Sequence, residues 1–160
     1  EFAADPGFAA ACSAAGLPRY ETSNWARPGE ESCHNLKYWR RDPVVAFGVS
    51  AASFDGRARR ANSGSIPAYL RSVGETGTAF VSEEVLSPDA ALREGVLLGL
   101  RLAIGVAEEA FEAARLTLAG SDRDRLDDAF AAGLLSRERG RVRLTREGTL
   151  LSNEVFALLL

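Results

Sequence analysis

The sequence lacks the residues and patterns that mark several classes of protein. Its two cysteines, Cys12 and Cys33, form neither a C-x-x-C pair nor the closely spaced set of a disulfide framework. No run reaches the ~18 apolar residues of a transmembrane helix, and the first residues do not have the pattern of a signal peptide. We therefore expect a cytoplasmic protein, in a reducing compartment, and not a secreted or membrane-spanning one.

An excess of charge of one sign is also missing. The 160 residues include 19 Lys or Arg and 22 Asp or Glu, for a formal net charge of −3, and Lys37 is the single lysine. Binding to nucleic acid usually requires a strongly basic surface, so we expect no nucleic-acid partner. Methionine is absent and the chain starts at Glu1, so we expect a piece of a longer protein.

The first half of the sequence alternates short helices with short strands, which predicts an α/β fold. Asp5-Pro6 is typical of a helix N-terminus and Gly16 of a helix end. The elements expected next are a strand at 17–23, an extended connection at 26–43, a strand at 43–48, a tight turn at 48–53, a hairpin at 54–60 and a helix at 66–73. Because one such unit cannot bury its own faces, we expect parallel-type strands with exposed apolar surfaces.

From about Val81 the pattern becomes that of a helical, winged module. Helices are expected to begin at Ser87-Pro88, to span 108–116, and to begin at a capping box at 121–124. A hairpin between Leu134 and Leu144 should lead to a last helix capped by Thr145. The inward-facing residues of that helix are expected to be Leu150, Leu151, Val155 and Leu158.

Residues suited to bind a flat aromatic ligand are concentrated in one short stretch. Both tryptophans, two of the three tyrosines and the only histidine lie between Tyr20 and Trp39. Aromatic rings stack on a macrocycle, and neutral imidazole is the commonest axial ligand of haem iron. The stretch ends in the segment His34-Asn35-Leu36-Lys37-Tyr38-Trp39. In a purely structural alternative, His34 and Asn35 hydrogen-bond a loop while Tyr38 and Trp39 pack in the core.

Several segments resemble, in the same order, the HemW proteins, relatives of the oxygen-independent coproporphyrinogen III oxidases. Tyr20–Ala26 is similar to the family's YEISNFA segment, and His34–Trp39 matches its HNxxYW motif in full. Leu98–Arg101 resembles the family's LGLR. Three segments resemble its C-terminal module, namely Gly133–Leu135, Leu144–Gly148 with the pattern LTxxG, and Leu151–Phe156.

The resemblance implies a fold and two domains. Residues 1–80 would be the C-terminal part of a radical S-adenosylmethionine (SAM) barrel and contain the HNxxYW segment. Residues 81–160 would be the α-rich, winged-helix-like C-terminal domain of the HemW and HemN proteins. The family's C-x3-C-x2-C ligands for a 4Fe-4S cluster are absent from this sequence. The cluster and SAM are therefore expected only in the intact protein.

The resemblance also implies a function, namely haem binding and haem delivery to acceptor proteins such as respiratory enzymes. His34, Asn35, Tyr38 and Trp39 would form the haem site. Transient membrane association and the oligomeric state stay open. In the alternative within the same family, the intact protein is an oxygen-independent coproporphyrinogen III oxidase of porphyrin biosynthesis. Whether the intact protein is an enzyme therefore also stays open.

The turn at 48–53 has a second implied role. Its sequence Gly48-Val49-Ser50-Ala51-Ala52-Ser53 is close to the GVSAIS of the oxidase branch, whereas many HemW proteins have histidine at the position of Ala52. The resemblance implies a weak contact of Gly48 and Ala52 with SAM, since glycine permits close approach of the backbone. The alternative is a turn that only connects two strands.

Two other functional classes were considered from the residues. A Ser–His hydrolase would need an orienting acid and a histidine near Ser50 or Ser53, and His34 is the only histidine. Arginines at the wing could suit DNA binding by a winged helix. Acidic residues of the preceding helix, Asp122 to Asp128, would oppose that binding.

Overall fold

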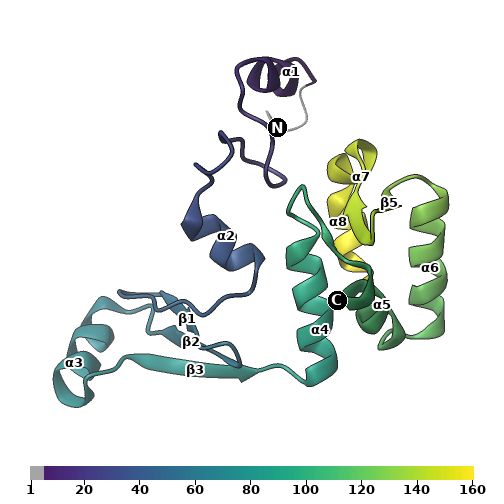
Figure 1. Cartoon of the computed structure of the whole chain (residues 1–160). Helices are drawn as coiled ribbons and strands as arrows, with labels where there is room; N and C mark the ends of the chain where they lie inside the picture. Colours follow the sequence, from purple (N-terminus) through teal and green to yellow (C-terminus); the bar gives the residue numbers. More distant parts are fainter. Residues whose placement is uncertain (1–5) are drawn as a thin grey trace. The chain divides into compact units, whose positions relative to one another are not determined.

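The computed structural model describes residues 6–160, so Asp5, the expected N-cap of the first helix, lies outside the described residues. The described chain divides into two compact units (Figure 1). One unit combines residues 6–40 with Pro88–Leu160, and the other is Arg41–Ser87. The domain boundary near residue 80 concerns the family's domain organisation and stays a prediction.

The Arg41–Ser87 unit is a three-stranded sheet with one helix. Its strands are β1 (Ala52–Phe54), β2 (Ala58–Asn62) and β3 (Phe80–Val85), and α3 (Ile66–Thr76) connects β2 to β3. Their order is β1-β2-β3 and both pairs are antiparallel. The expectation of parallel-type strands was wrong. For β1 and β2 the reason is that the three residues between them are too few for the crossover that parallel strands require.

The expected hairpin is confirmed, and Asp55 fixes its turn. The Asp55 carboxylate accepts hydrogen bonds from the backbone N–H groups of Arg57 (2.8 Å) and Ala58 (2.7 Å). These bonds, with the Arg60 guanidinium, hold the pKa of Asp55 well below its usual range. The strand expected at 43–48 is reduced to an isolated bridge between Val44 and Phe54.

Large apolar side chains are exposed in this unit, as the sequence pattern predicts. The most exposed are Val45 and Phe47 at 74% and 86%. Along α3 and β3 the exposed apolar residues are Ile66, Leu70, Val73, Phe80, Val81 and Val85. The unit therefore has apolar surface that its own elements do not cover.

The N-terminal part of the other unit differs from the sequence prediction. After α1 (Pro6–Ala14), the segment expected as a strand at 17–23 forms only isolated bridges, Arg19 to Trp25 and Glu21 to Leu102. The connection expected to be extended contains α2 (Cys33–Trp39). The Ser32 side chain caps this helix by accepting a hydrogen bond from the backbone N–H of Asn35 (3.3 Å).

A buried carboxylate explains why the segment after α1 is a loop and not a strand. Glu21 is 1% exposed. Its carboxylate accepts hydrogen bonds from the Thr22 hydroxyl (3.1 Å), the Ser23 backbone N–H (3.1 Å) and the Asn24 side-chain amide. A buried charged group must find such partners, and here the next three residues supply them by turning back around it.

The C-terminal part has the expected helical and winged architecture. Its elements are α4 (Pro88–Gly99), β4 (Val106–Ala107), α5 (Glu108–Leu116), α6 (Gly120–Ala131), β5 (Leu135–Glu138), β6 (Arg141–Leu144), α7 (Arg146–Leu150) and α8 (Ser152–Ala157). The strands pair antiparallel in the order β4-β6-β5. The residues of the core include Val96, Leu100, Phe111, Leu126, Val142, Val155 and Phe156.

Two details of this part correct the sequence prediction. Helix α6 begins after Ala119 with no side-chain cap, so residues 121–124 are inside the helix and do not form a capping box. The chain end is two short helices, and Leu150 and Leu151 are about half exposed while Val155 and Leu158 are buried. The break between α7 and α8 turns the two leucines away from the core.

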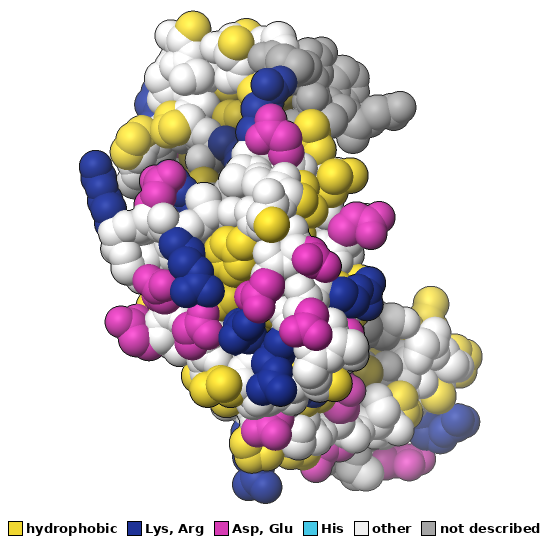
Figure 2. All heavy atoms as spheres, turned by 90° about the vertical axis from the view of Figure 1, so that its right-hand side faces the viewer, with side chains coloured by type: hydrophobic (Ala, Val, Ile, Leu, Met, Phe, Trp, Pro, Cys, Tyr) yellow, Lys and Arg dark blue, Asp and Glu magenta, His cyan; other side chains and the backbone are white. Residues whose placement is uncertain are grey.

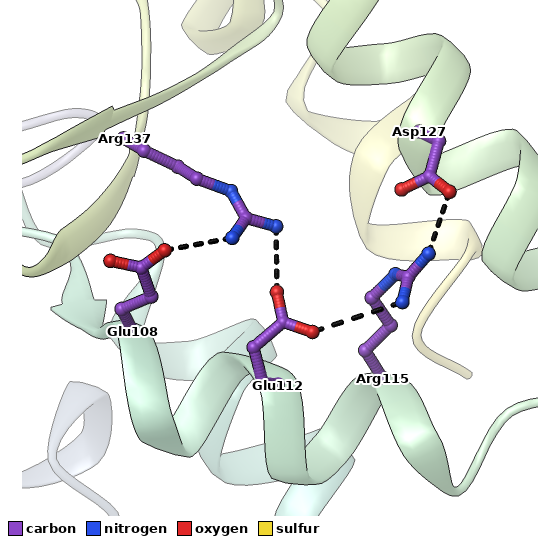
Figure 3. Close-up of polar contacts among 5 residues, drawn as sticks. All are labelled: Glu108, Glu112, Arg115, Asp127 and Arg137. Carbon is purple, nitrogen blue, oxygen red and sulfur yellow. Dashed lines mark hydrogen bonds and ion pairs between the residues drawn. The ribbon is translucent and has the colours of Figure 1, made fainter.

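An ion-pair network joins α5 to β5 and α6. Figure 3 shows Arg137 between Glu108 (2.7 Å) and Glu112 (2.6 Å), and Arg115 in contact with Glu112 and Asp127. Partial burial by itself would lower the pKa of Arg137, but the hydrogen bonds and charges of the two glutamates outweigh it and raise the pKa of the guanidinium. A network of this kind fixes the wing strand on the helices more firmly than isolated surface pairs would.

Gly148 provides the first stability prediction. A Cβ atom at this position would lie 1.8 Å from the carbonyl oxygen of Leu134, so the close approach of the two segments requires glycine. We expect Gly148→Ala to lower the free energy of unfolding by about 1–3 kcal/mol. Gly95 in α4 is the matched control, since an added Cβ there meets nothing within 4 Å. Gly95→Ala should instead raise stability by about 0.5–1 kcal/mol, and denaturant unfolding of both variants measures the difference.

The buried carboxylate of Glu21 provides the second stability prediction. Glu21→Ala leaves the donors of Thr22, Ser23 and Asn24 without their buried acceptor, so we expect a loss of about 1–3 kcal/mol. Glu30→Ala is the control, because the Glu30 side chain is 64% exposed and its removal should change stability by less than about 0.5 kcal/mol. Equal unfolding midpoints for the two variants would contradict the role of the buried carboxylate.

Candidate functional site

Helix α2 has two different faces. Each residue of a helix is rotated by about 100° from the one before it, which places His34 between Lys37 and Tyr38 on one side. Together with Cys33 and Arg40, these three residues are exposed. Asn35, Leu36 and Trp39 are on the opposite side and are partly buried. The exposed face, defined by residues 33, 34, 37, 38 and 40, therefore combines an imidazole, a thiol, a phenol and two cations.

The aromatic groups of the exposed face contact each other. The rings of His34 and Tyr38 meet edge to face, with centroids 5.0 Å apart and an interplanar angle of 81°. This is a favoured geometry for aromatic pairs, and it leaves the imidazole at the surface. Within residues 6–160, no hydrogen bond or ion pair of the structure engages the side chains of His34 and Lys37.

The partly buried face attaches α2 to the rest of its unit. The Asn35 side-chain amide donates to the hydroxyl of Tyr20 (3.4 Å), which connects HNxxYW to the preceding motif. The guanidinium of Arg101 lies over the ring of Trp39, 4.5 Å from its centroid. Asn35 and Trp39 are thus contacts of the helix with its own unit, whereas His34 and Tyr38 are accessible to a ligand.

The turn at 48–53 belongs to the other unit, and its backbone is already engaged. Gly48 donates its N–H to the Tyr69 hydroxyl (3.2 Å), and its carbonyl accepts from the side chain of Asn62 (2.8 Å). The φ of Gly48 is 105°, which favours glycine, while Ala52 pairs with Ala61 at the start of β1. The backbone conformation, rather than crowding, accounts for the glycine, because an added Cβ meets nothing within 4 Å.

Three of the wing arginines considered for DNA binding have partners within the protein. Arg137 pairs with Glu108 and Glu112, Arg143 with Glu138, and Arg141 donates to the carbonyls of Ile104 and Gly105. Figure 2, which views the molecule from the right-hand side of Figure 1, shows basic and acidic side chains interspersed on the surface. Such a surface has little excess positive charge to offer a phosphate backbone.

The described part of the chain has neither a metal-binding cluster nor a membrane-spanning helix. Among residues 6–160, no group of three or more His, Cys, Asp or Glu side chains could hold a metal ion. In the same range no helix is long and apolar enough to cross a bilayer. The exposed face of α2, with the contact of His34 and Tyr38, is the candidate ligand site.

Sequence reasoning missed two features of this site. It gave no role to Lys37 and Arg40, although the helical spacing of residues 34, 37 and 38 could have placed Lys37 beside the histidine. It noted Leu98–Arg101 as a motif but not the contact of Arg101 with Trp39. The position of Arg101 directly after the apolar helix α4 was the signal that could have indicated a contact of this kind.

Comparison with known proteins gives consistent results. Residues 86–151 match the family model of the HemN C-terminal domain. The chain is 34% identical to the "Heme chaperone HemW" of Bacillus subtilis over 91% of its own length and 38% of the relative's. It is 36% identical to that of Mycobacterium tuberculosis over 92% of its own length and 36% of the relative's. It spans less than two fifths of the length of these relatives.

A solved structure supports the fold. Coproporphyrinogen III oxidase (HemN) from Escherichia coli, a radical SAM enzyme, superimposes with a TM-score of 0.70 at 19% identity, covering 94% of this chain and 38% of that chain. The likeness in fold extends beyond residues 86–151. The expected α/β fold, with the fold of the C-terminal part of a radical SAM protein followed by the HemN C-terminal domain, is thus confirmed. Residues 86–151 thus belong to the HemN C-terminal domain family, and the chain is similar to HemW proteins over more than nine tenths of its length.

Proposed function

We propose that this chain carries the haem-binding helix of a cytoplasmic haem chaperone of the radical SAM family. The intact protein would deliver haem to acceptor proteins such as respiratory enzymes. The observation that carries the proposal is the exposed face of α2, where His34 and Tyr38 are in contact at the surface and the cations Lys37 and Arg40 are also exposed. The naming of the relatives as haem chaperones supports it.

The chemistry of this face fits haem group by group. Haem supplies an iron that accepts a neutral imidazole nitrogen as an axial ligand, and His34 offers one. Tyr38 offers an aromatic surface for the apolar macrocycle. Lys37 and Arg40 offer positive charge to the two carboxylates at the edge of haem. Asn35 and Trp39 support the site from the other side of the helix.

The residues present do not fit the family's 4Fe-4S cluster, which requires three thiolates, since the chain has only the two free cysteines Cys12 and Cys33 and neither matches the C-x3-C-x2-C set. We assign the cluster and SAM to the intact protein, with Gly48 and Ala52 as weak SAM contacts in this chain. The oxidase alternative has less support than the chaperone, because the likeness to HemN at 19% identity bears on the fold alone. The interspersed acidic and basic side chains on the surface argue against a nucleic-acid partner.

The first test replaces the proposed iron ligand in the intact protein. We expect His34→Ala to shift the Soret band of bound haem and to weaken haem binding at least tenfold, the scale of loss when even a residue that only hydrogen-bonds a metal ligand is removed. Haem titration followed by absorbance measures both. Cys33→Ser is the matched control, because Cys33 is the exposed neighbour of His34 on the same helix. A Soret shift in Cys33→Ser but not in His34→Ala would refute the imidazole assignment.

The second test concerns the haem carboxylates. Haem dimethyl ester has the same iron and macrocycle but no carboxylate charge. We expect Lys37→Ala to weaken haem binding about two- to fivefold, the range of an exposed ion pair, and to leave binding of the ester unchanged. Arg71→Ala, which removes an exposed cation of α3, should affect neither ligand. Equal losses for haem and its ester in Lys37→Ala would contradict a charge contact.

A further inference from the structure

Arg101 occupies a position between two aromatic rings from distant parts of the sequence. Its guanidinium carbon lies 4.5 Å from the ring centroid of Trp39 and 5.4 Å from that of Phe156. Trp39 is the last residue of α2, and Phe156 is a core residue of α8 that is 6% exposed. We name this group of Trp39, Arg101 and Phe156 the arginine clamp.

Within residues 6–160, two polar atoms of the clamp have no hydrogen bonds that could hold the side chains in place instead of the stacking. The Nε atoms of Trp39 and Arg101 are both buried, and neither has a hydrogen-bond partner in the part of the chain that the structure describes. A cation over an aromatic face gains most when water is excluded. The stacking is therefore the main interaction that holds the Arg101 side chain in this place.

The main chain at Arg101 strengthens the same junction. The carbonyl of Arg101 accepts a hydrogen bond from the N–H of Thr22 (2.8 Å), and the N–H of Ala103 donates to the carbonyl of Tyr20 (2.9 Å). Tyr20 in turn accepts from Asn35 of α2. One residue of the C-terminal part thus contacts the helix through its side chain and the preceding motif through its backbone.

The clamp acts on the face of α2 that points away from the proposed ligand. Trp39 follows His34 by five residues, so their side chains are about 140° apart around the helix. Fixing Trp39 against Arg101, which in turn contacts Phe156, consequently sets the rotation of α2 and directs His34 and Tyr38 outward. Loss of the clamp would free this rotation without removing any group that contacts the ligand.

We propose that Arg101 is a positioning residue of the haem site, which couples the C-terminal domain to the HNxxYW helix through the arginine clamp. This inference rests on the proposed haem-binding function. Arginine suits the role better than lysine, because its planar guanidinium stacks on both rings and stays charged when partly buried. The C-terminal domain thereby determines how the haem helix presents its ligand.

The experiment uses the intact protein with Arg101→Ala and Arg101→Lys. Haem affinity should fall about three- to tenfold in Arg101→Ala, between the values of an exposed and a fully desolvated cation–π contact, and less in Arg101→Lys. The Soret maximum should stay at the wild-type position, because His34 remains the ligand. Near-UV circular dichroism without haem should change, since Trp39 loses its fixed surroundings; Trp39→Phe identifies its contribution.

Arg115→Ala is the matched control for a merely structural effect. Arg115 has a buried Nε without a hydrogen-bond partner in the described chain, as Arg101 has, but its ion pairs connect α5 and α6. It should lower the unfolding temperature and leave haem affinity unchanged. If Arg101→Ala folds poorly, Phe156→Leu removes one ring of the clamp with an apolar replacement and should weaken haem binding in the same way.

The outcomes separate this inference from the proposed function. Unchanged haem binding in His34→Ala would contradict the proposed function itself. A strong effect of His34→Ala together with wild-type haem affinity in Arg101→Ala and Phe156→Leu would overturn only the positioning role. Equal losses of haem affinity in Arg101→Ala and Arg115→Ala would overturn it as well, since the effect would then follow stability.

Discussion

A helix of seven residues cannot persist in water by its own hydrogen bonds, and α2 is such a helix. Its shape depends on what it packs against. The Ser32 cap fixes where it begins, and the stacking of Trp39 on Arg101 fixes how it is rotated. Everything proposed about the exposed face follows from this constraint, because the direction of His34 is determined by the residues on the opposite side of the helix.

The same dependence extends to the loop before the helix. Glu21 is a charged side chain in a place where water is excluded, and the following residues bond it instead of forming a strand. The Tyr20 carbonyl and the Thr22 N–H then bond the 101–103 segment. Two of the motifs that carry the family resemblance, Tyr20–Ala26 and His34–Trp39, are therefore parts of one structure and not independent ligand contacts.

The sequence predicted those elements whose determinants are local. Asp55-Gly56 gave the first hairpin, and Arg139-Gly140, both with positive φ, the second. Thr145 capped its helix as expected. The failures have a non-local or competing cause. The segment of α2 was predicted as an extended connection from Pro28-Gly29 and its many charges, and the cap by Ser32 was not recognised. The contact of Trp39 with Arg101 joins residues far apart in the sequence, and no periodic pattern could have indicated it.

Exposure of the proposed ligand face is consistent with delivery rather than storage. A buried haem site gains affinity from apolar contact on both faces of the macrocycle, but a protein that passes haem on must let it leave. On α2 the imidazole and the phenol are at the surface, and the cations beside them would hold haem through screened, exchangeable charge contacts. The proposed site would combine one specific bond to iron with weak surrounding contacts. An acceptor that offers its own axial ligand and a more apolar pocket could then take the haem without any opening of the core beneath α2.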